Sequence, residues 1–231
     1  SYSHFTSMAY WHTGTPNGGD EFGWMGRTAD VMRSKQAEDI LINVGSTQSL
    51  AVKSATHTPL VFDDPMRFQR SYWMNQVDFS SSVEARYENS NREFLKAVDV
   101  SAKTSAKRIR NAWSDYETNV DYGIVPMDLP KVASCIDAGL ETQLYHVSFR
   151  NNAFDTHVQQ PNLHRRLLSY ASDAIFGFVN DLQRLGHGDR VVVMVYSEFG
   201  RRVPENANLG TDHGSANNMF FIGNKVNGGH Y

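Results

Sequence analysis

Two apolar runs separated by a long amphipathic segment give the clearest structural pattern in the chain. Thr142 to Phe149 and Arg190 to Ser197 are rich in β-branched and aromatic residues, which is typical of strands buried on both faces of a sheet. Between them, apolar side chains recur every three or four residues from Leu163 to Leu185. This spacing predicts one helix, with Pro161 at its start and Gly186 at its end. The whole pattern predicts a βαβ unit with two parallel strands in one sheet.

Three further segments have shorter or weaker patterns. Met219 to Gly223 is an apolar run that predicts another strand, and Leu129 to Ala138 is amphipathic and closes at Gly139, which predicts a short helix. Glu88 to Tyr116 has an apolar stripe with helical spacing. The basic residues within it, interpreted as a solvated helix face, are Lys103, Lys107, Arg108 and Arg110. Together these elements predict an α/β fold, with a mainly parallel central sheet flanked by helices.

The composition agrees with one sizeable domain and argues against several classes of protein. A chain of 231 residues that is 40% hydrophobic can bury one large core, so residues 1–231 are expected to form a single domain. The 22 basic and 25 acidic side chains give a net charge of −3, which argues against a nucleic-acid-binding surface. No run of about 18 apolar residues is present, so no transmembrane helix is expected. The single cysteine, Cys135, cannot form an intramolecular disulfide and is interpreted as a packed core residue.

Carboxylates and imidazoles follow the predicted strands in three short motifs. These motifs are Asp155-Thr156-His157, Ser197-Glu198-Phe199-Gly200 and Thr211-Asp212-His213-Gly214. Because the carboxyl ends of parallel strands meet at one edge of a sheet, we expect Asp155 and Glu198 to emerge at the same edge. Carboxylate oxygens and imidazole nitrogens together suit Zn, Mn or a related divalent ion. Such an ion would activate water or a hydroxyl for attack at phosphorus, sulfur or carbon.

Several of these candidates also have a purely structural interpretation. Asp155 could cap the helix that follows it, since Asp favours such positions. Glu198 could pair with Arg201, because a carboxylate at the end of a buried strand needs a cation nearby. His164, on the first turn of the long helix, could reach the site as an outer residue or could be a partly buried imidazole without a role in chemistry.

Asp212 and His213 are adjacent, and this limits how both could serve one ion. Neighbouring side chains diverge on an extended backbone, so one of the two would bind the ion while the other points away. Gly210 and Gly214 favour an irregular loop, in which both could point the same way.

Taken in order, the motifs resemble a known family. Phe-Asp-Thr-His from Phe154, Ser-Glu-Phe-Gly-Arg from Ser197 and Asp-His-Gly from Asp212, together with the opening SYSHFTSMAYWHTG, are similar to the domain-of-unknown-function family DUF1501. The resemblance covers most of the chain, including Tyr122 to His146, and is loose over residues 50–115. This family is placed in the alkaline phosphatase and sulfatase superfamily, so the resemblance implies an alkaline phosphatase-like α/β domain.

The resemblance also implies roles for individual residues. In that superfamily, acidic and histidine residues at the carboxyl ends of strands hold one or two metal ions, and a Ser or Thr at a helix N-terminus is the nucleophile. The implied metal ligands are Asp155, His157, Glu198, Asp212 and His213, and the implied outer residues are His4, His164 and Arg202. Ser3 is the candidate nucleophile. Glu198 takes the place of the usual Asp, and Phe199 stands where many members have a second ligand His.

The same resemblance carries expectations about the rest of the protein. The first metal-binding Asp of the superfamily is expected on a strand upstream of Ser3, and sheet-closing elements are expected after Tyr231. The domain is therefore expected to be incomplete at both ends. The resemblance further implies a bacterial protein exported to the periplasm, commonly through a twin-arginine signal.

The chemistry that fits these residues is hydrolysis of a phosphate or sulfate ester of a small molecule or a saccharide. A divalent ion, with Zn, Mn and Ca all open, would lower the pKa of the Ser3 hydroxyl or of a water, and Arg201 or Arg202 would offset charge on the transferred group. No Cys/Ser-x-Pro-x-Arg sequence surrounds Ser3 or Cys135, so a formylglycine sulfatase is disfavoured. The alternative is a non-catalytic exported binding or surface protein that retains the fold and a structural ion, which Phe199 favours.

Overall fold

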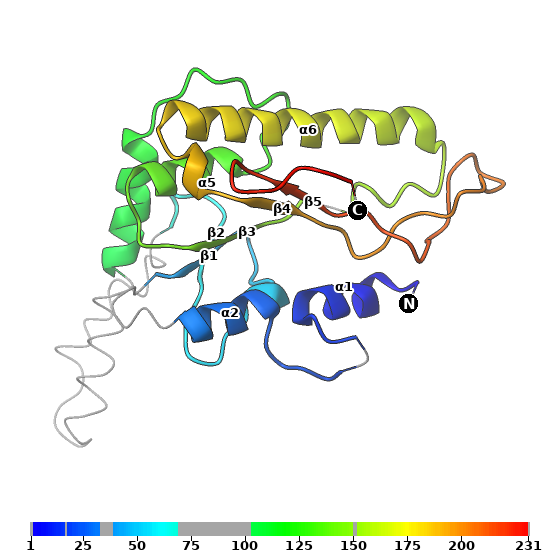
Figure 1. The fold of residues 1–231 in the computed structure, drawn as a ribbon, viewed down its shortest axis with the longest axis horizontal. Helices are drawn as coiled ribbons and strands as arrows, with labels where there is room; N and C mark the ends of the chain where they lie inside the picture. The colour runs from blue at the N-terminus through cyan, green and yellow to red at the C-terminus, as the bar shows by residue number, and fades with distance from the viewer. Residues whose placement is uncertain (1, 17, 33–38, 69–102, 150–151, 231) are drawn as a thin grey trace.

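The computed structural model describes residues 2–16, 18–32, 39–68, 103–149 and 152–230 (Figure 1). Three of the strands form one sheet in the order β2-β1-β3. Its central strand β1 (Leu41–Val44) lies between β2 (Leu60–Phe62) and β3 (Leu144–Val147), and both pairings are parallel. Ile42 of β1 stands opposite Leu60 and Tyr145. The predicted α/β class with a parallel sheet is therefore confirmed.

Helices lie on both sides of the strands (Figure 1). On one side are α5 (Leu129–Asp137) and α6 (Gln160–Arg184), and on the other are α1 (His4–Thr13) and α2 (Trp24–Met32). The short 3-10 helix η1 (Leu50–Val52) contacts α1 and α2, and a second one, η2 (Gly188–Arg190), follows α6. Among the described residues, no helix combines the length and the apolar character needed to cross a membrane.

Strand β1 separates two hydrophobic clusters, because successive side chains of a strand point to opposite faces of the sheet. Ile42 and Val44 belong to a cluster that also contains buried residues of α5 and α6. Leu41 belongs to a second cluster, which contains buried residues of α2 and η1. All four residues of β1 are buried, so the strand that carries the core is a short one that the sequence pattern did not predict.

The three predicted helices are present in the described residues. Helix α6 matches its prediction closely, and Gly186 behind it has a left-handed φ of 80°. Helix α5 also matches, and within it Cys135 is buried, which raises the pKa of its thiol to about 12. The third helix is seen over residues 103–115, with Ile109 buried, while the predicted start at Glu88 lies outside the described residues.

The predicted βαβ unit is wrong in its strand pairing. Strand β4 (Val193–Val195) pairs antiparallel with β5 (Phe220–Ile222), and within the described residues it forms no ladder with β3. Val191 and Val193 pack against the core cluster of β1, α5 and α6, but Val192 between them is half exposed. Every residue of β4 is only partly buried, so the expected burial on both faces of a sheet is also wrong. The strand predicted from Met219 to Gly223 is confirmed as β5.

A buried carboxylate fastens α6 to the segment that follows the helix over residues 103–115. Asp181 is fully buried and accepts hydrogen bonds from the hydroxyls of Tyr116, Tyr122 (2.8 Å) and Thr118 (2.9 Å). Arg184 pairs with the same carboxylate at 2.7 Å. Burial alone raises the pKa of Asp181, but these hydrogen bonds outweigh it and lower the pKa below its ordinary value. The network anchors α6, whose first turn supports the site described next.

Candidate metal centre

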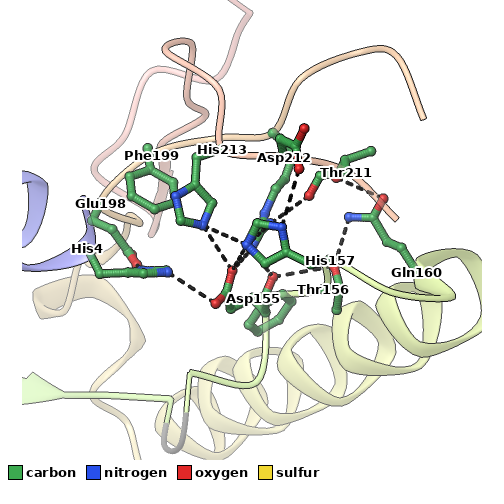
Figure 2. Close-up of polar contacts among 12 residues, drawn as sticks. His4, Asp155, Thr156, His157, Gln160, Glu198, Phe199, Thr211, Asp212 and His213 are labelled. Carbon is green, nitrogen blue, oxygen red and sulfur yellow. Dashed lines mark hydrogen bonds and ion pairs between the residues drawn. The ribbon is translucent and has the colours of Figure 1, made fainter. Parts of the chain in front are cut away.

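Imidazole rings from three parts of the chain point at the carboxylate of Asp155 (Figure 2). The Nε2 atoms of His157 and His213 lie 2.9 Å and 3.1 Å from its Oδ1 atom, and Nε2 of His4 lies 3.2 Å from Oδ2. The Nε2 atoms of His157 and His213 are also 2.9 Å apart. The side chain of Asp155 is 28% exposed, so the cluster is partly shielded from water and still open on one side.

In His213 and His157, the ring nitrogen that points away from Asp155 faces an oxygen atom. Nδ1 of His213 lies 2.6 Å from the backbone carbonyl oxygen of Tyr2, and Nδ1 of His157 lies 3.5 Å from Oδ1 of Asp212. A carbonyl oxygen can only accept a hydrogen bond, so Nδ1 of His213 carries a hydrogen. In a neutral His213 ring, Nε2 then holds a lone pair directed at the interior of the cluster, where Nε2 of His157 can donate to it.

His4, the first residue of α1, completes the cluster from the other end of the chain. Its Nδ1 atom lies 2.7 Å from Oε1 of Glu198, and its buried Nε2 atom has no hydrogen-bond partner, although Asp155 is close. His4, Asp155 and His213 each offer a ligand atom, and these atoms lie within 4.8 Å of one another. His157 adjoins this group, since its Nε2 atom lies 2.9 Å from both Asp155 and His213.

Arg201 neutralises Asp155 and ties the surrounding loops together. Its Nη2 atom donates to Oδ1 of Asp155 at 2.5 Å and to the Phe154 carbonyl at 3.1 Å, and its Nη1 atom donates to the Thr211 carbonyl at 2.8 Å. Burial alone raises the pKa of Asp155, but the hydrogen bond and the charge of Arg201, together with the nearby imidazoles, outweigh it and hold the pKa well below its ordinary value. The suggested Glu198–Arg201 ion pair is not among the contacts of the described residues.

Backbone pairing brings the second and third motifs side by side. Arg201 and His213 form an isolated antiparallel bridge, and the amide of Arg202 donates to the carbonyl of Asp212 at 2.9 Å. The loop of residues 198–202 is thereby held against residues 211–214. The site is thus assembled by loop pairing, not by two neighbouring parallel strands as the sequence pattern predicted.

The loop of residues 206–211 packs directly on the first motif. Asn206 donates to the carbonyl of His157 at 3.1 Å, and the Thr211 hydroxyl donates to Oε1 of Gln160 at 3.0 Å. A Cβ atom at Gly210 would lie 2.1 Å from the carbonyl carbon of His157. Only glycine allows this close approach, so Gly210 is part of the frame that positions His157.

Ser3, the candidate nucleophile, stands at the N-cap position of α1, and its side chain does not cap the helix. It lies in the chain between Tyr2 and His4, both of which contact the cluster. Arg202 is exposed, and its guanidinium lies 5.4 Å from the centre of the Tyr2 ring. Ser3 and Arg202 are therefore next to residues that touch the cluster, without belonging to it.

Aromatic rings border the cluster. The Phe199 ring lies 4.3 Å from the His213 ring and 4.8 Å from the His4 ring, so an apolar face closes one side of the site. His164 on α6 packs edge-on against Phe154 at 5.8 Å, and its Nδ1 atom is buried without a hydrogen-bond partner. Burial, with a smaller effect from the charge of Arg201, lowers the pKa of His164.

The comparisons with known proteins identify the family of the chain. The family described as "Protein of unknown function (DUF1501)" matches residues 2–231. The chain belongs to the DUF1501 family. No curated protein and no solved structure matches it. The match spans all the motifs of the site, so the cluster around Asp155 lies within the DUF1501 domain.

Of the site residues predicted from the sequence, some lie in the cluster around Asp155 and others lie beside it. Asp155, His157 and His213 meet directly, while Glu198 reaches the cluster through His4 and Asp212 is exposed behind His157. His4, which was expected as an outer residue, lies within the cluster. No local signal marks this role, because the residue that orients His4 is 194 positions away in the chain.

Proposed function

We propose that this protein is a metal-dependent hydrolase of phosphate or sulfate esters. The observation that carries the proposal is the convergence of the Nε2 atoms of His157 and His213 on Asp155, with an oxygen acceptor behind each ring. Metal-binding histidines are typically oriented by an acceptor on the nitrogen that faces away from the ion. The three side chains therefore fit a divalent ion as a ligand set.

The donor atoms narrow the choice of ion. Imidazole nitrogens suit Zn and related ions, and carboxylate oxygens suit Mn and harder ions, whereas Ca takes roughly six to eight oxygen ligands. A set with more imidazoles than carboxylates favours Zn, then Mn, over Ca. When bound, a divalent ion supplies Lewis-acid activation of a hydroxyl or water and offsets negative charge on the oxygens of the ester.

The residues of the chain provide the other parts of the reaction. Ser3 forms a bond to phosphorus or sulfur while the bond to the ester oxygen breaks, and the departing alcohol takes up the proton that the serine loses. Water then hydrolyses the serine ester and restores the hydroxyl. Arg202 is exposed beside Tyr2, where its guanidinium can pair with the transferred group, and Arg201 keeps Asp155 ionised. The substrates in this proposal are phosphate or sulfate esters of small molecules or saccharides.

Membership of the DUF1501 family supports the remaining parts of the proposal. Through the superfamily resemblance described above, it favours an alkaline phosphatase-like arrangement of the domain and export to the periplasm. The N-cap position of Ser3 agrees with the placement of the superfamily nucleophile at a helix N-terminus.

A non-catalytic exported binding or surface protein is the second candidate. Phe199 favours it, because its ring covers His213 and His4 where a second ligand would otherwise be expected. In that case the cluster around Asp155 would hold a structural ion without turnover.

Turnover separates the two candidates. The full chain, loaded with Zn²⁺ or Mn²⁺, is expected to hydrolyse p-nitrophenyl phosphate or p-nitrophenyl sulfate, and Ser3→Ala is expected to lower kcat by about 1000-fold or more. Ser172→Ala, on the exposed face of α6, is the matched control and should keep full activity. Binding of the ion without turnover of either ester would support the structural role instead.

A further inference from the structure

His4 is held between two carboxylates that play different parts. Its Nδ1 atom lies 2.7 Å from Oε1 of Glu198, while its Nε2 atom lies 3.2 Å from Oδ2 of Asp155 and has no hydrogen-bond partner. The side chain of His4 is 23% exposed, so water has limited access to the ring. Figure 2 shows His4 and Glu198 on one side of the cluster, with the His4 ring directed at Asp155.

The two contacts of His4 cannot both be hydrogen bonds of a neutral ring. A neutral imidazole has one N–H group, and the short contact with Glu198 assigns it to Nδ1. Nε2 then presents a lone pair to Oδ2 of Asp155, which is also an acceptor. Two acceptors at 3.2 Å repel each other unless a cation lies between them, and Arg201 is bound at the other oxygen, Oδ1. A metal ion bound by both atoms removes that repulsion.

The carboxylate of Glu198 contacts His4 and Ser197. Its Oε1 atom contacts Nδ1 of His4, and its Oε2 atom accepts a hydrogen bond from the Ser197 hydroxyl at 2.9 Å. The metal-site spacing of 4.8 Å is met by His4, Asp155 and His213, and Glu198 is not in that group. Both carboxylate oxygens of Glu198 are therefore occupied outside the group of ligand atoms.

His213 repeats the arrangement with a backbone acceptor. Its Nδ1 atom faces the carbonyl of Tyr2 at 2.6 Å, and its Nε2 atom faces Asp155 at 3.1 Å. Two rings therefore share the same orientation, with Nδ1 on an acceptor and Nε2 toward Asp155. This is the geometry in which an outer carboxylate or carbonyl fixes the tautomer of a metal-binding histidine.

We propose that His4 is a ligand of the ion and that Glu198 is a positioning residue, which holds the His4 ring in its binding tautomer from outside the coordination shell. This inference rests on the metal site of the proposed function. It exchanges the roles expected from sequence, in which Glu198 is a ligand and His4 an outer residue. It also makes α1 the source of a ligand, so the N-terminal helix belongs to the metal site.

Metal affinity of the full chain tests the assignment. Calorimetric titration with Zn²⁺ is expected to give a Kd about 10- to 100-fold higher for Glu198→Ala than for the parent, with unchanged stoichiometry. Glu198→Gln should be affected less, because its amide oxygen can still accept from Nδ1 of His4. His4→Ala should weaken binding by more than about 100-fold, beyond the usual effect of an outer residue. Glu205→Gln, at an exposed position, is the matched control and should bind as the parent does.

Two spectroscopic readouts do not depend on activity. With Co²⁺ in place of Zn²⁺, the visible absorption bands should keep their positions in Glu198→Gln and shift in His4→Ala, because only the second change alters the ligand set. In the metal-free chain, nitrogen NMR should show His4 as the single tautomer with hydrogen on Nδ1, and Glu198→Ala should lose this preference. The tautomer measurement remains informative if a variant binds no ion.

The outcomes distinguish this inference from the function on which it rests. If the parent binds no divalent ion, the metal site fails, and the inference fails with it. If the parent binds an ion and His4→Ala binds it equally well, the ligand assignment of His4 is overturned while the metal site stands. Loss of binding in Glu198→Gln as severe as in Asp155→Asn would show that Glu198 is itself a ligand.

Discussion

Replacing Gly210 with Ala tests whether the loop of residues 206–211 sets the position of His157. A Cβ atom at Gly210 would lie 2.1 Å from the carbonyl carbon of His157 and 2.6 Å from the amide nitrogen of Val158. Ordinary contacts begin at 3.4 Å, so the two backbones must separate by about 1.3 Å, the difference between 3.4 Å and 2.1 Å. Because both contacts are to backbone atoms, no side chain can rotate away to relieve the clash.

A displacement of this size is large for a metal ligand. Nε2 of His157 lies 2.9 Å from Asp155, and ligand distances in metal sites vary by only about 0.2 Å. The change is therefore expected to lower Zn²⁺ affinity by about 100-fold or more, comparable to the effect of a misplacement of about 1 Å in an active site. Overpacking at this point should also lower the free energy of unfolding by about 1–3 kcal/mol.

Calorimetric titration with Zn²⁺ and urea denaturation measure the two effects on the same protein. Gly19→Ala is the matched control, because no heavy atom lies within 4 Å of a Cβ at Gly19. Its affinity should equal that of the parent, and its unfolding free energy should change by less than about 0.5 kcal/mol. If Gly210→Ala folds and binds Zn²⁺ as tightly as the parent, the loop does not position His157, and the reasoning is refuted.

Other predictions concern the core and the acid limit of stability. Asp181→Asn should lower the free energy of unfolding by about 3 kcal/mol in urea denaturation, because it breaks a buried charged network. The Zn²⁺ affinity should not change. A loss of less than about 1 kcal/mol would show that the network contributes little to stability. Although burial opposes it, hydrogen bonds from Ser54 and Thr56 lower the pKa of Asp30 to about 2. Its stabilisation is therefore present above the unfolded-state pKa of about 4 and is lost as pH falls toward 2. The stability difference between the parent and Asp30→Asn should shrink over that window, and a pH-independent difference would disprove the linkage. Burial raises the pKa of the Cys135 thiol to about 12, so the thiol should react with a thiol reagent only on unfolding. Cys135→Ala should lower the free energy of unfolding by about 1 kcal/mol without changing metal binding.

The longest repeating pattern of apolar residues in the sequence gives the most accurate prediction of an element. Helix α6 was predicted to within about two residues because its apolar positions repeat over seven turns and Pro161 and Gly186 mark its ends. Strands β1 and β2, with four and three residues, are too short to show a period, and the polar Asn43 interrupts β1. The apolar run that contains β4 did not predict its antiparallel pairing with β5, because such a run leaves the partner strand undetermined, and its partial burial also differs from the expectation.

Some residues of the site can be predicted from local motifs, whereas the roles of others depend on contacts between distant parts of the chain. The motifs around Asp155, His157 and His213 were found because ligand-type residues follow predicted strands, although the structure brings them together by loop pairing. His4 was given an outer place because Ser3-His4 has no spacing that marks a ligand. Its role depends on Glu198, and a contact between such distant residues has no signal in a single sequence.

The contacts that complete the site also link the two halves of the chain. His4 meets Glu198 across 194 positions, and Tyr2 meets His213 across 211. Closing such long loops costs entropy that local contacts do not, so these contacts are expected to form late, after the core around β1 and α6 has assembled. An ion bound there would stabilise only those chains in which the N-terminal helix α1 is already docked, by an amount that grows with the free ion concentration. Metal occupancy would then measure the fraction of fully folded chains, and removal of the first few residues would abolish ion binding while leaving the core intact.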